Sequence, residues 1–176
     1  MTAQDNGLKL SVTIDVVIRK AQQDDLDKLE WYGQFTHFRR LFRRSFEDQR
    51  LGKRLLLVAD VNGFPVGRLF VQLYSENGVL ADGTSKGYLY SLHVMEMFRG
   101  HGIGSRLIHI AEQVLRNKHY SYATIAVAKE NEGALRLYQR HDYHIFDEND
   151  GRWRYTDHQG KTHDIYEPCY LLEKKL

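Results

Sequence analysis

Three glycines alternate within five residues of this sequence, at Gly100, Gly102 and Gly104. They lie between a run typical of a β-strand, which ends at Val94, and a run of apolar residues at helical spacing. Glycine permits positive φ and lets an anion approach the backbone closely, and the N–H groups at a helix N-terminus attract negative charge. The turn therefore predicts a site for a pyrophosphate group that needs no lysine.

Two common phosphate-binding motifs do not fit this turn or its surroundings. A P-loop needs a glycine five residues before its Gly-Lys-Thr, but Tyr155 holds that place before residues 160–162. The dinucleotide motif G-x-G-x-x-G, started at Gly100, has Ser105 where its last glycine belongs. An ordinary strand-to-helix turn remains the alternative, although three glycines in five residues are more than such a turn needs.

A second segment, residues 127–143, strengthens the first signal. Asn131 is placed to cap a short predicted helix, and Tyr138 lies on that helix among apolar residues. The pattern Arg-x-x-Gly-x-Gly at 99–104 resembles the acyl-CoA signature of the GNAT superfamily of N-acetyltransferases. The pattern Asn-x-x-Ala-x-x-Leu-Tyr at 131–138 is similar to the second conserved block of that family. Two motifs at the expected separation are more specific than either alone.

The resemblance covers most of the chain, from Val16 to about Leu172, and departs at one position. Asp142 stands where the family usually has a glycine before the aromatic residue that closes the second block. The implied fold is α+β (mixed α/β), with a central, mostly antiparallel twisted sheet that is splayed at the acyl-CoA site and flanked by helices.

The resemblance also implies acetyl-CoA as co-substrate and no metal. Backbone groups of the strand before the glycine turn would bind the pantetheine, the turn would hold the pyrophosphate, and Asn131 would contact the pantetheine from the other side. The implied acetyl-CoA-binding residues are Leu92, His93, Val94, Arg99, Gly100, His101, Gly102, Ile103, Gly104, Ser105 and Asn131. For His101 a solvated loop position, and for Asn131 a simple helix cap, are the alternatives.

By the same resemblance, Tyr138 is the general acid that protonates the departing thiolate. A phenol with a pKa near 10 gives its proton to a thiolate near 8.5 at a cost of roughly 2 kcal/mol, which a short hydrogen bond can offset. The alternative is a tyrosine of the helix core with its hydroxyl group at the surface.

The general base is not indicated by a motif. One branch of the family has a glutamate five residues before the asparagine, where this sequence has Ala126. Tyr88 and Tyr90 are the remaining catalytic candidates, because they lie on the strand before the glycine turn. Alternation predicts that both share a face with Leu92 and Val94. They would either line the acceptor site and pass protons through water or simply pack.

These features together predict an N-acetyltransferase that transfers an acetyl group to a primary amine by direct attack in a ternary complex. No cysteine or serine motif indicates a covalent intermediate. The acceptor is expected to be a small-molecule or peptide amine. One alternative is a non-catalytic acyl-CoA-binding or regulatory module of the same fold, which would have no need for Tyr138. Another is nucleic-acid binding through the arginine-rich helix expected over 34–49.

Several elements are expected to position these residues. Strands are predicted at 16–18, 55–61, 66–74, 88–94 and 124–127, and helices from Asp24, over 34–49, after the glycine turn and around 134–138. A hairpin turn is expected at Asn62-Gly63, and hairpins are expected after Tyr143, with turns at 149–151 and 159–160. The phenylalanines of the helix over 34–49 are expected to pack on the sheet and its arginines to be solvated.

Composition limits the remaining possibilities. The 176 residues fit one domain, expected over residues 14–176 after a loose lead-in at 1–13. The net charge of +2 provides no overall attraction to nucleic acid or membrane, and the single Cys169 excludes an internal disulfide. The start of the sequence shows no secretory signal, so a cytoplasmic location is expected. A homodimer is left open, and the pairs of histidines near 141 and 158 match no metal motif.

Overall fold

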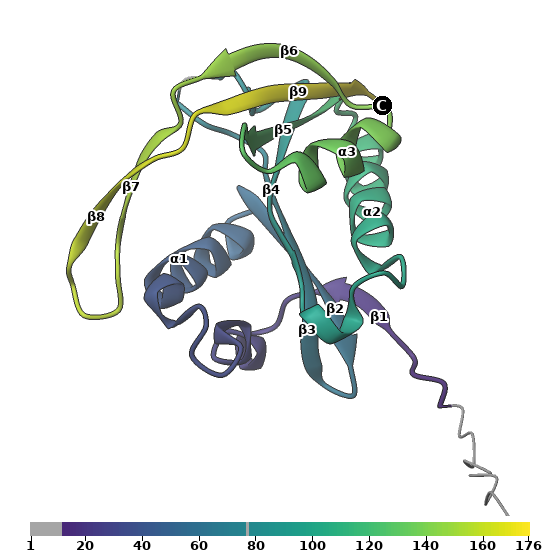
Figure 1. Ribbon diagram of the computed structural model, residues 1–176, viewed down its shortest axis with the longest axis vertical. Helices are drawn as coiled ribbons and strands as arrows, with labels where there is room; N and C mark the ends of the chain where they lie inside the picture. The colour runs from purple at the N-terminus through teal and green to yellow at the C-terminus, as the bar shows by residue number, and fades with distance from the viewer. Residues whose placement is uncertain (1–11, 77) are drawn as a thin grey trace, which may run out of the picture.

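The computed structural model describes residues 12–76 and 78–176 (Figure 1). Most of the expected lead-in, residues 1–13, thus lies outside the described residues. The strands are β1 (Val17–Lys20), β2 (Arg54–Val61), β3 (Phe64–Gln72), β4 (Lys86–Val94), β5 (Tyr122–Ala128), β6 (His144–Asn149), β7 (Arg152–Thr156), β8 (Thr162–Tyr166) and β9 (Cys169–Lys175). The helices are α1 (Arg39–Arg50), α2 (Ile103–Asn117) and α3 (Glu132–Arg140), with 3₁₀ turns η1 (Gln23–Asp25), η2 (Lys28–Glu30), η3 (Thr36–Phe38) and η4 (Glu96–Phe98). Within the described ranges, no helix is long and apolar enough to cross a membrane.

Seven strands form one sheet in the order β1-β2-β3-β4-β5-β9-β6, and β7 and β8 pair separately as a hairpin. Neighbouring strands run antiparallel except β4 and β5, which are parallel. The predicted α+β class with a mostly antiparallel sheet is confirmed. The turn at Asn62-Gly63 is confirmed as well, since both residues have positive φ and join β2 to β3.

The N-terminal half of the sheet is covered on both faces. Leu56 and Val58 of β2 pack under α1, whereas the alternate residues Leu55 and Leu57 belong to the core under α2. Figure 1 shows α1 and α2 on opposite sides of these strands. A side chain on either face of β2 or β3 is therefore excluded from solvent.

The helix predicted over 34–49 begins later, at Arg39, because residues 36–38 form the 3₁₀ turn η3. Its apolar stripe is confirmed, since Phe42 and Phe46 are buried against the sheet. The solvated side of the helix carries the exposed residues Arg40, Arg43 and Arg44. The apolar stripe therefore belongs to the core of the protein.

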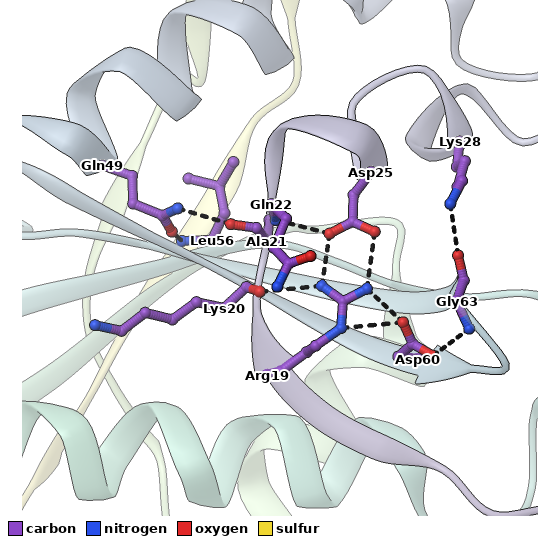
Figure 2. Close-up of polar contacts among 10 residues, drawn as sticks. All are labelled: Arg19, Lys20, Ala21, Gln22, Asp25, Lys28, Gln49, Leu56, Asp60 and Gly63. Atoms are coloured by element: carbon purple, nitrogen blue, oxygen red, sulfur yellow. Dashed lines mark hydrogen bonds and ion pairs between the residues drawn. The ribbon is translucent and has the colours of Figure 1, made fainter.

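The expected helix from Asp24 is wrong, because the chain forms only the 3₁₀ turns η1 and η2 there. The Asp25 carboxylate accepts hydrogen bonds from the backbone N–H of Gln22 at 2.7 Å and from the Arg19 guanidinium at 2.6 and 2.9 Å. Arg19 also forms an ion pair with Asp60 of β2 (Figure 2). These bonds hold the segment to the sheet edge, and Trp31, with φ of 44°, turns the chain out of a helical path.

Candidate active site

Strand β4 carries a β-bulge at the centre of the predicted site. Ser91 has a φ of 56°, and Ser91 and Leu92 together lie opposite the single residue Leu69 of β3. The extra residue reverses the alternation that follows it. Tyr90 packs toward the α1 core, whereas Leu92 and Val94 pack against the α2 core. The prediction that all three share one face is therefore wrong, and the bulge is the physical reason.

Strands β4 and β5 separate at the same place. Their parallel pairing runs from Lys86, opposite Tyr122, to Leu89, opposite Ile125, and ends there. β5 continues to Ala128 alongside β9, while β4 continues to Val94 alongside β3. The edges of β4 and β5 beyond Leu89 are therefore not paired with each other. An extended chain with amide groups can bind to such an edge as an added strand.

The glycine turn follows the end of β4 and has the geometry of an anion site. Gly100 and Gly102 have φ of 78° and 79°, and a Cβ built on either would meet no atom within 4 Å. Gly104 lies in the first turn of α2, where a Cβ would meet only Val94 Cγ2, at 4.0 Å. No side chain caps the N-terminus of α2. Open space and uncapped N–H groups coincide here, which suits a pyrophosphate group.

The other predicted residues of the turn support its shape. The Arg99 side chain donates from Nε to the Val94 carbonyl at 3.0 Å and so ties the turn to β4. His101 is exposed, and its Nδ1 lies 3.3 Å from the Phe98 carbonyl. Ile103 is buried under the sheet. Its burial anchors the first turn of α2, whose N–H groups remain directed outward.

Helix α3 lies beside this turn. The Asn131 side chain accepts a hydrogen bond from the backbone N–H of Ala134 at 3.0 Å, so its role as helix cap is established. At the other end of α3, His141 Nε2 lies 2.9 Å from Ser105 Oγ and connects the two helices. Asp142 has a φ of 65°, a conformation that glycine adopts most easily and aspartate tolerates. The turn expected of the family is thus kept without its usual glycine.

Tyr138 projects from α3 into the core and is 8% exposed. Its ring packs edge-on against that of Tyr143, with centroids 6.1 Å apart. Burial raises the pKa of Tyr138 to about 12. The Tyr143 hydroxyl donates to Glu112 at 3.1 Å, whereas the Tyr138 hydroxyl forms no hydrogen bond with the described residues. Tyr138 therefore stays protonated at any ordinary pH and has a donor to offer.

Two of the three tyrosines predicted for catalysis, Tyr88 and Tyr90, are in contact with each other. The rings of Tyr88 and Tyr90 stack at 5.4 Å. The pKa of Tyr88 is raised, mainly by burial and further by the neighbouring Tyr90, Cys169 and Tyr138. The Tyr90 hydroxyl accepts a hydrogen bond from Arg54 at 2.5 Å, and its ring packs edge-on against Phe70. Tyr90 is thus bound to the α1 side of the sheet with Tyr88 stacked on it, whereas Tyr138 belongs to the core under α2.

The α1 side of the site contains a buried arginine that sequence reasoning missed. Arg68 of β3 is fully buried and lies opposite His93 of β4. The signal available in the sequence is an arginine inside the apolar strand Val66–Val71. The His93 ring lies 5.1 Å from that of Phe35, on the face opposite Leu92 and Val94. His93 is predicted to bind the cofactor, but its side chain lies on the α1 side of the sheet. Only its backbone is available to a ligand on the α2 side.

Two carboxylates near the site are poorly placed to act as a base. Glu30 forms an ion pair with Arg39 and accepts from Thr36 at 2.8 Å, and these partners lower its pKa. Glu96 is exposed on η4. Burial and the nearby Arg68 charge lower the pKa of His93 to about 4, against a weaker opposing effect of the Ser91 carbonyl. No dedicated base with a pKa near neutrality emerges from these groups.

The β7–β8 hairpin extends from the sheet as an arm over the α1 side (Figure 1). Tyr155 of the arm packs on Phe38 at 5.0 Å and stacks on His163 at 4.9 Å. His163 in turn lies 2.7 Å from the Asp157 carboxylate. Tyr155 therefore fastens the arm to η3, and His163 supports Tyr155 from within the arm. Among the described residues, no three His, Cys, Asp or Glu side chains gather as metal ligands.

Comparisons with known proteins agree with this geometry. The sequence matches the Acetyltransferase (GNAT) family over residues 19–143. No match was found among curated proteins. The fold is similar to Arabidopsis thaliana NAA60 in complex with acetyl-CoA (TM-score 0.69, 20% identity, 92% of this chain and 99% of that chain). Another structure of similar fold is A. thaliana Naa50 in complex with the bisubstrate analogue CoA-Ac-MVNAL (TM-score 0.66, 20% identity, 92% of this chain and 99% of that chain). A third is a GNAT family acetyltransferase from Elizabethkingia anophelis with acetyl-CoA bound (TM-score 0.61, 19% identity, 92% of this chain and 98% of that chain).

The family match spans the bulged strand, the glycine turn and the helix that carries Tyr138. The structural neighbours include proteins crystallised with acetyl-CoA, and the open glycine turn with its uncapped helix fits such a ligand. On this evidence the chain belongs to the GNAT family of acetyltransferases.

Proposed function

We propose that the protein transfers the acetyl group of acetyl-CoA to a primary amine by direct attack in a ternary complex. The observation that supports this most strongly is the separation of β4 from β5 at Leu89, which shares one buried cluster with Tyr138. A chain bound along the free edge of β4 would place a reactive end next to a protonated phenol. A module that only binds acyl-CoA would not require that phenol.

In this proposal, the cofactor binds on the α2 side of the sheet and the acceptor on the α1 side. Acetyl-CoA supplies the activated acetyl group when it is bound. The glycine turn and the N-terminus of α2 hold negative charge on the α2 side, and the β4 backbone beyond Leu89 offers hydrogen bonds to an extended chain. The acceptor then has to arrive from the α1 side, between β4 and the β7–β8 arm.

The reaction requires two proton movements. The acceptor nitrogen forms a bond to the acetyl carbon as the carbon–sulfur bond breaks. Tyr138 donates its proton to the leaving sulfur and regains one from solvent, and the amine loses one proton to water. With the pKa of Tyr138 at about 12, transfer to a thiolate near 8.5 costs roughly 5 kcal/mol. Tyr138 therefore stabilises the sulfur by hydrogen bonding as its charge develops, and its proton is transferred only as solvent reprotonates the phenolate.

An acetyl-CoA-dependent assay of thiol release tests the proposal directly. The acceptor panel should contain peptide N-termini, because Naa50, a structure of similar fold, was solved with a peptide bisubstrate analogue. Free amino acids, polyamines and aminoglycosides complete it. Thiol release with a matching acetylated amine would support the proposal. Tight binding of CoA without transfer to any of these amines would contradict it.

We expect kcat/KM for the acceptor to rise with pH until the pH reaches the pKa of the free amine. The reason is that no candidate base is suited to take the proton. Glu30 is paired with Arg39, and His93 is neutral above about pH 4 but has a pKa too low for an effective base. Ala126 stands where one branch of the family has a glutamate. An α-amine near pKa 7.7–8.0 is roughly a tenth to a fifth neutral at pH 7, whereas a lysine-like amine near 10.4 is about 0.04% neutral. Two acceptors with different pKa values should therefore give profiles displaced by that difference.

The control for this profile is Tyr90→Phe, which removes the hydrogen bond from Arg54 and should lower kcat only modestly, by less than about 10-fold. Profiles that level off at the same pH near 6–7 for both amines would show a dedicated base and contradict the prediction. In that event, glutamine substitutions at Glu30, Glu96 and His93 would locate the base.

A further inference from the structure

Arg68 is a buried cation without a counter-charge. It is 0% exposed, and it forms no ion pair with any carboxylate among the described residues. Burial alone accounts for the lowering of its pKa, to about 9. Its guanidinium carbon lies 4.1 Å from the centroid of Phe35 and about as close to Trp31 and Phe42, at 4.9 and 5.1 Å. These aromatic faces offset part of the desolvation but accept no strong hydrogen bond.

The hydrogen bonds of Arg68 are incomplete on one particular edge. Nη1 donates to the Leu29 carbonyl at 3.3 Å, and Nε donates to Ser91 Oγ, also at 3.3 Å. Nη2 is buried and has no hydrogen-bond partner. Nε and Nη2 form the same edge of the guanidinium, and this edge binds a carboxylate through two parallel hydrogen bonds. The carboxylate-binding edge of Arg68 is thus directed toward Ser91 and is unfilled at Nη2.

Ser91 is the bulge residue of β4, two residues beyond the end of its pairing with β5, so the Nε end of this edge is hydrogen-bonded to the segment of β4 that is free of β5. His93, opposite Arg68, is partly exposed, and its Nδ1 is the other buried side-chain nitrogen in the described residues that lacks a hydrogen-bond partner. The two incomplete groups therefore lie together, on the face from which the acceptor has to arrive. Buried polar groups are normally hydrogen-bonded, so two unpartnered atoms on this face leave room for a ligand that accepts a hydrogen bond.

We infer that the acceptor amine carries a carboxylate, and that the Nε–Nη2 edge of Arg68 binds this carboxylate beside Ser91. The inference rests on the proposed function, because it names the acceptor class of the same site. Two sources share this chemistry: the α-carboxylate of a free amino acid and the side-chain carboxylate of an acidic N-terminal residue. Arg68 is a binding and specificity residue in this scheme and takes no part in proton transfer.

The test compares acceptors with and without this charge, and kcat/KM is expressed per neutral amine because a carboxamide also lowers the pKa of the neighbouring amine. Glycine, alanine and glutamate are assayed against their α-carboxamides, and the amidated peptide Asp-Ala-Ala is assayed against Asn-Ala-Ala. Wild-type enzyme should prefer the acid of at least one source by 10-fold or more in kcat/KM. Arg68→Met should lower kcat/KM for that acid by about 30- to 1,000-fold and change the amide by less than 3-fold. KM for acetyl-CoA should stay within about 2-fold.

A second measurement needs no turnover. Thermal shifts of the CoA-loaded protein with the same probes should show stabilisation by the acids over the amides. If Arg68→Met does not fold, Arg68→Lys takes its place. Lysine keeps the charge but loses the two parallel donors of the guanidinium, so this variant should retain part of the preference for acids. Equal use of acids and amides, with acetyl transfer observed, would overturn the inference and leave the proposed function intact. Carboxylate-dependent stabilisation that is lost in Arg68→Met, without any acetyl transfer, would support carboxylate binding at Arg68 and contradict the proposed function.

Discussion

Replacing Gly104 with valine should raise the Kd for CoA by about 100-fold or more while the protein stays folded. The backbone of Gly104 is helical, and a Cβ there meets only Val94 Cγ2, at 4.0 Å, so a side chain can begin at this position without a clash. This position lies at the uncapped N-terminus of α2, where the pyrophosphate would bind. Loss of two charge-assisted hydrogen bonds, at about 1.5–3 kcal/mol each, gives this magnitude. Isothermal titration calorimetry with CoA measures it.

Gln113→Val is the matched control for this variant, because Gln113 is exposed on the same helix. Both variants should unfold within roughly 1 kcal/mol of the wild type, since valine in a helix differs from either residue by less than that. Near-normal affinity for CoA in folded Gly104→Val would remove the glycine turn from the cofactor site.

The contact of the turn with CoA can also be tested at Gly102, with Gly63 as a control position that has the same backbone strain. Gly102 and Gly63 have φ of 79° and 81°, and a Cβ on either meets nothing within 4 Å. Alanine at each position carries a similar conformational penalty of about 1–2 kcal/mol. Only Gly102→Ala should also weaken CoA binding. Equal affinity in the two alanine variants would mean that the turn at Gly102 does not contact the ligand.

The glycine turn could be predicted because its geometry depends on residue type. Gly100 and Gly102 hold positive φ that other residues adopt at a cost, and the apolar spacing after them predicts α2. The bulge at Ser91 could not be predicted, since serine carries no signal for its φ of 56°. One unpredicted residue was enough to move Tyr90 to the face opposite Leu92 and Val94.

The position of Arg68 could not be predicted for a different reason. Alternation along β3 assigns its side chain to one face of the sheet but does not say whether anything covers that face. Phe35 and Trp31 cover it, and they come from a segment where a helix was expected and 3₁₀ turns formed. The arm formed by β7 and β8 is a second example. Its turn residues predict a hairpin, but its placement over η3 depends on contacts between distant segments, such as that of Tyr155 with Phe38.

Replacing Tyr138 with phenylalanine should lower kcat by about 100- to 10,000-fold and leave CoA affinity within a few-fold, the range expected when a positioned acid is lost. The substitution removes only a hydroxyl group that bonds to no described residue, so the free energy of unfolding should barely change. Because the pKa of Tyr138 is raised to about 12, the loss should be the same at every pH between 6 and 10. Pre-steady-state acetyl transfer, with denaturant unfolding in parallel, measures both effects.

Tyr143→Phe provides the reciprocal control, because its ring packs against that of Tyr138 and its hydroxyl donates to buried Glu112 at 3.1 Å. This variant should lose about 1–3 kcal/mol of unfolding free energy, since Glu112 loses a buried donor, and should keep kcat nearly unchanged. The same chemical change in two touching rings thus separates catalysis from packing. An unchanged kcat in Tyr138→Phe would leave Tyr138 as a core residue, and the proton of the leaving thiolate would then have to come from water.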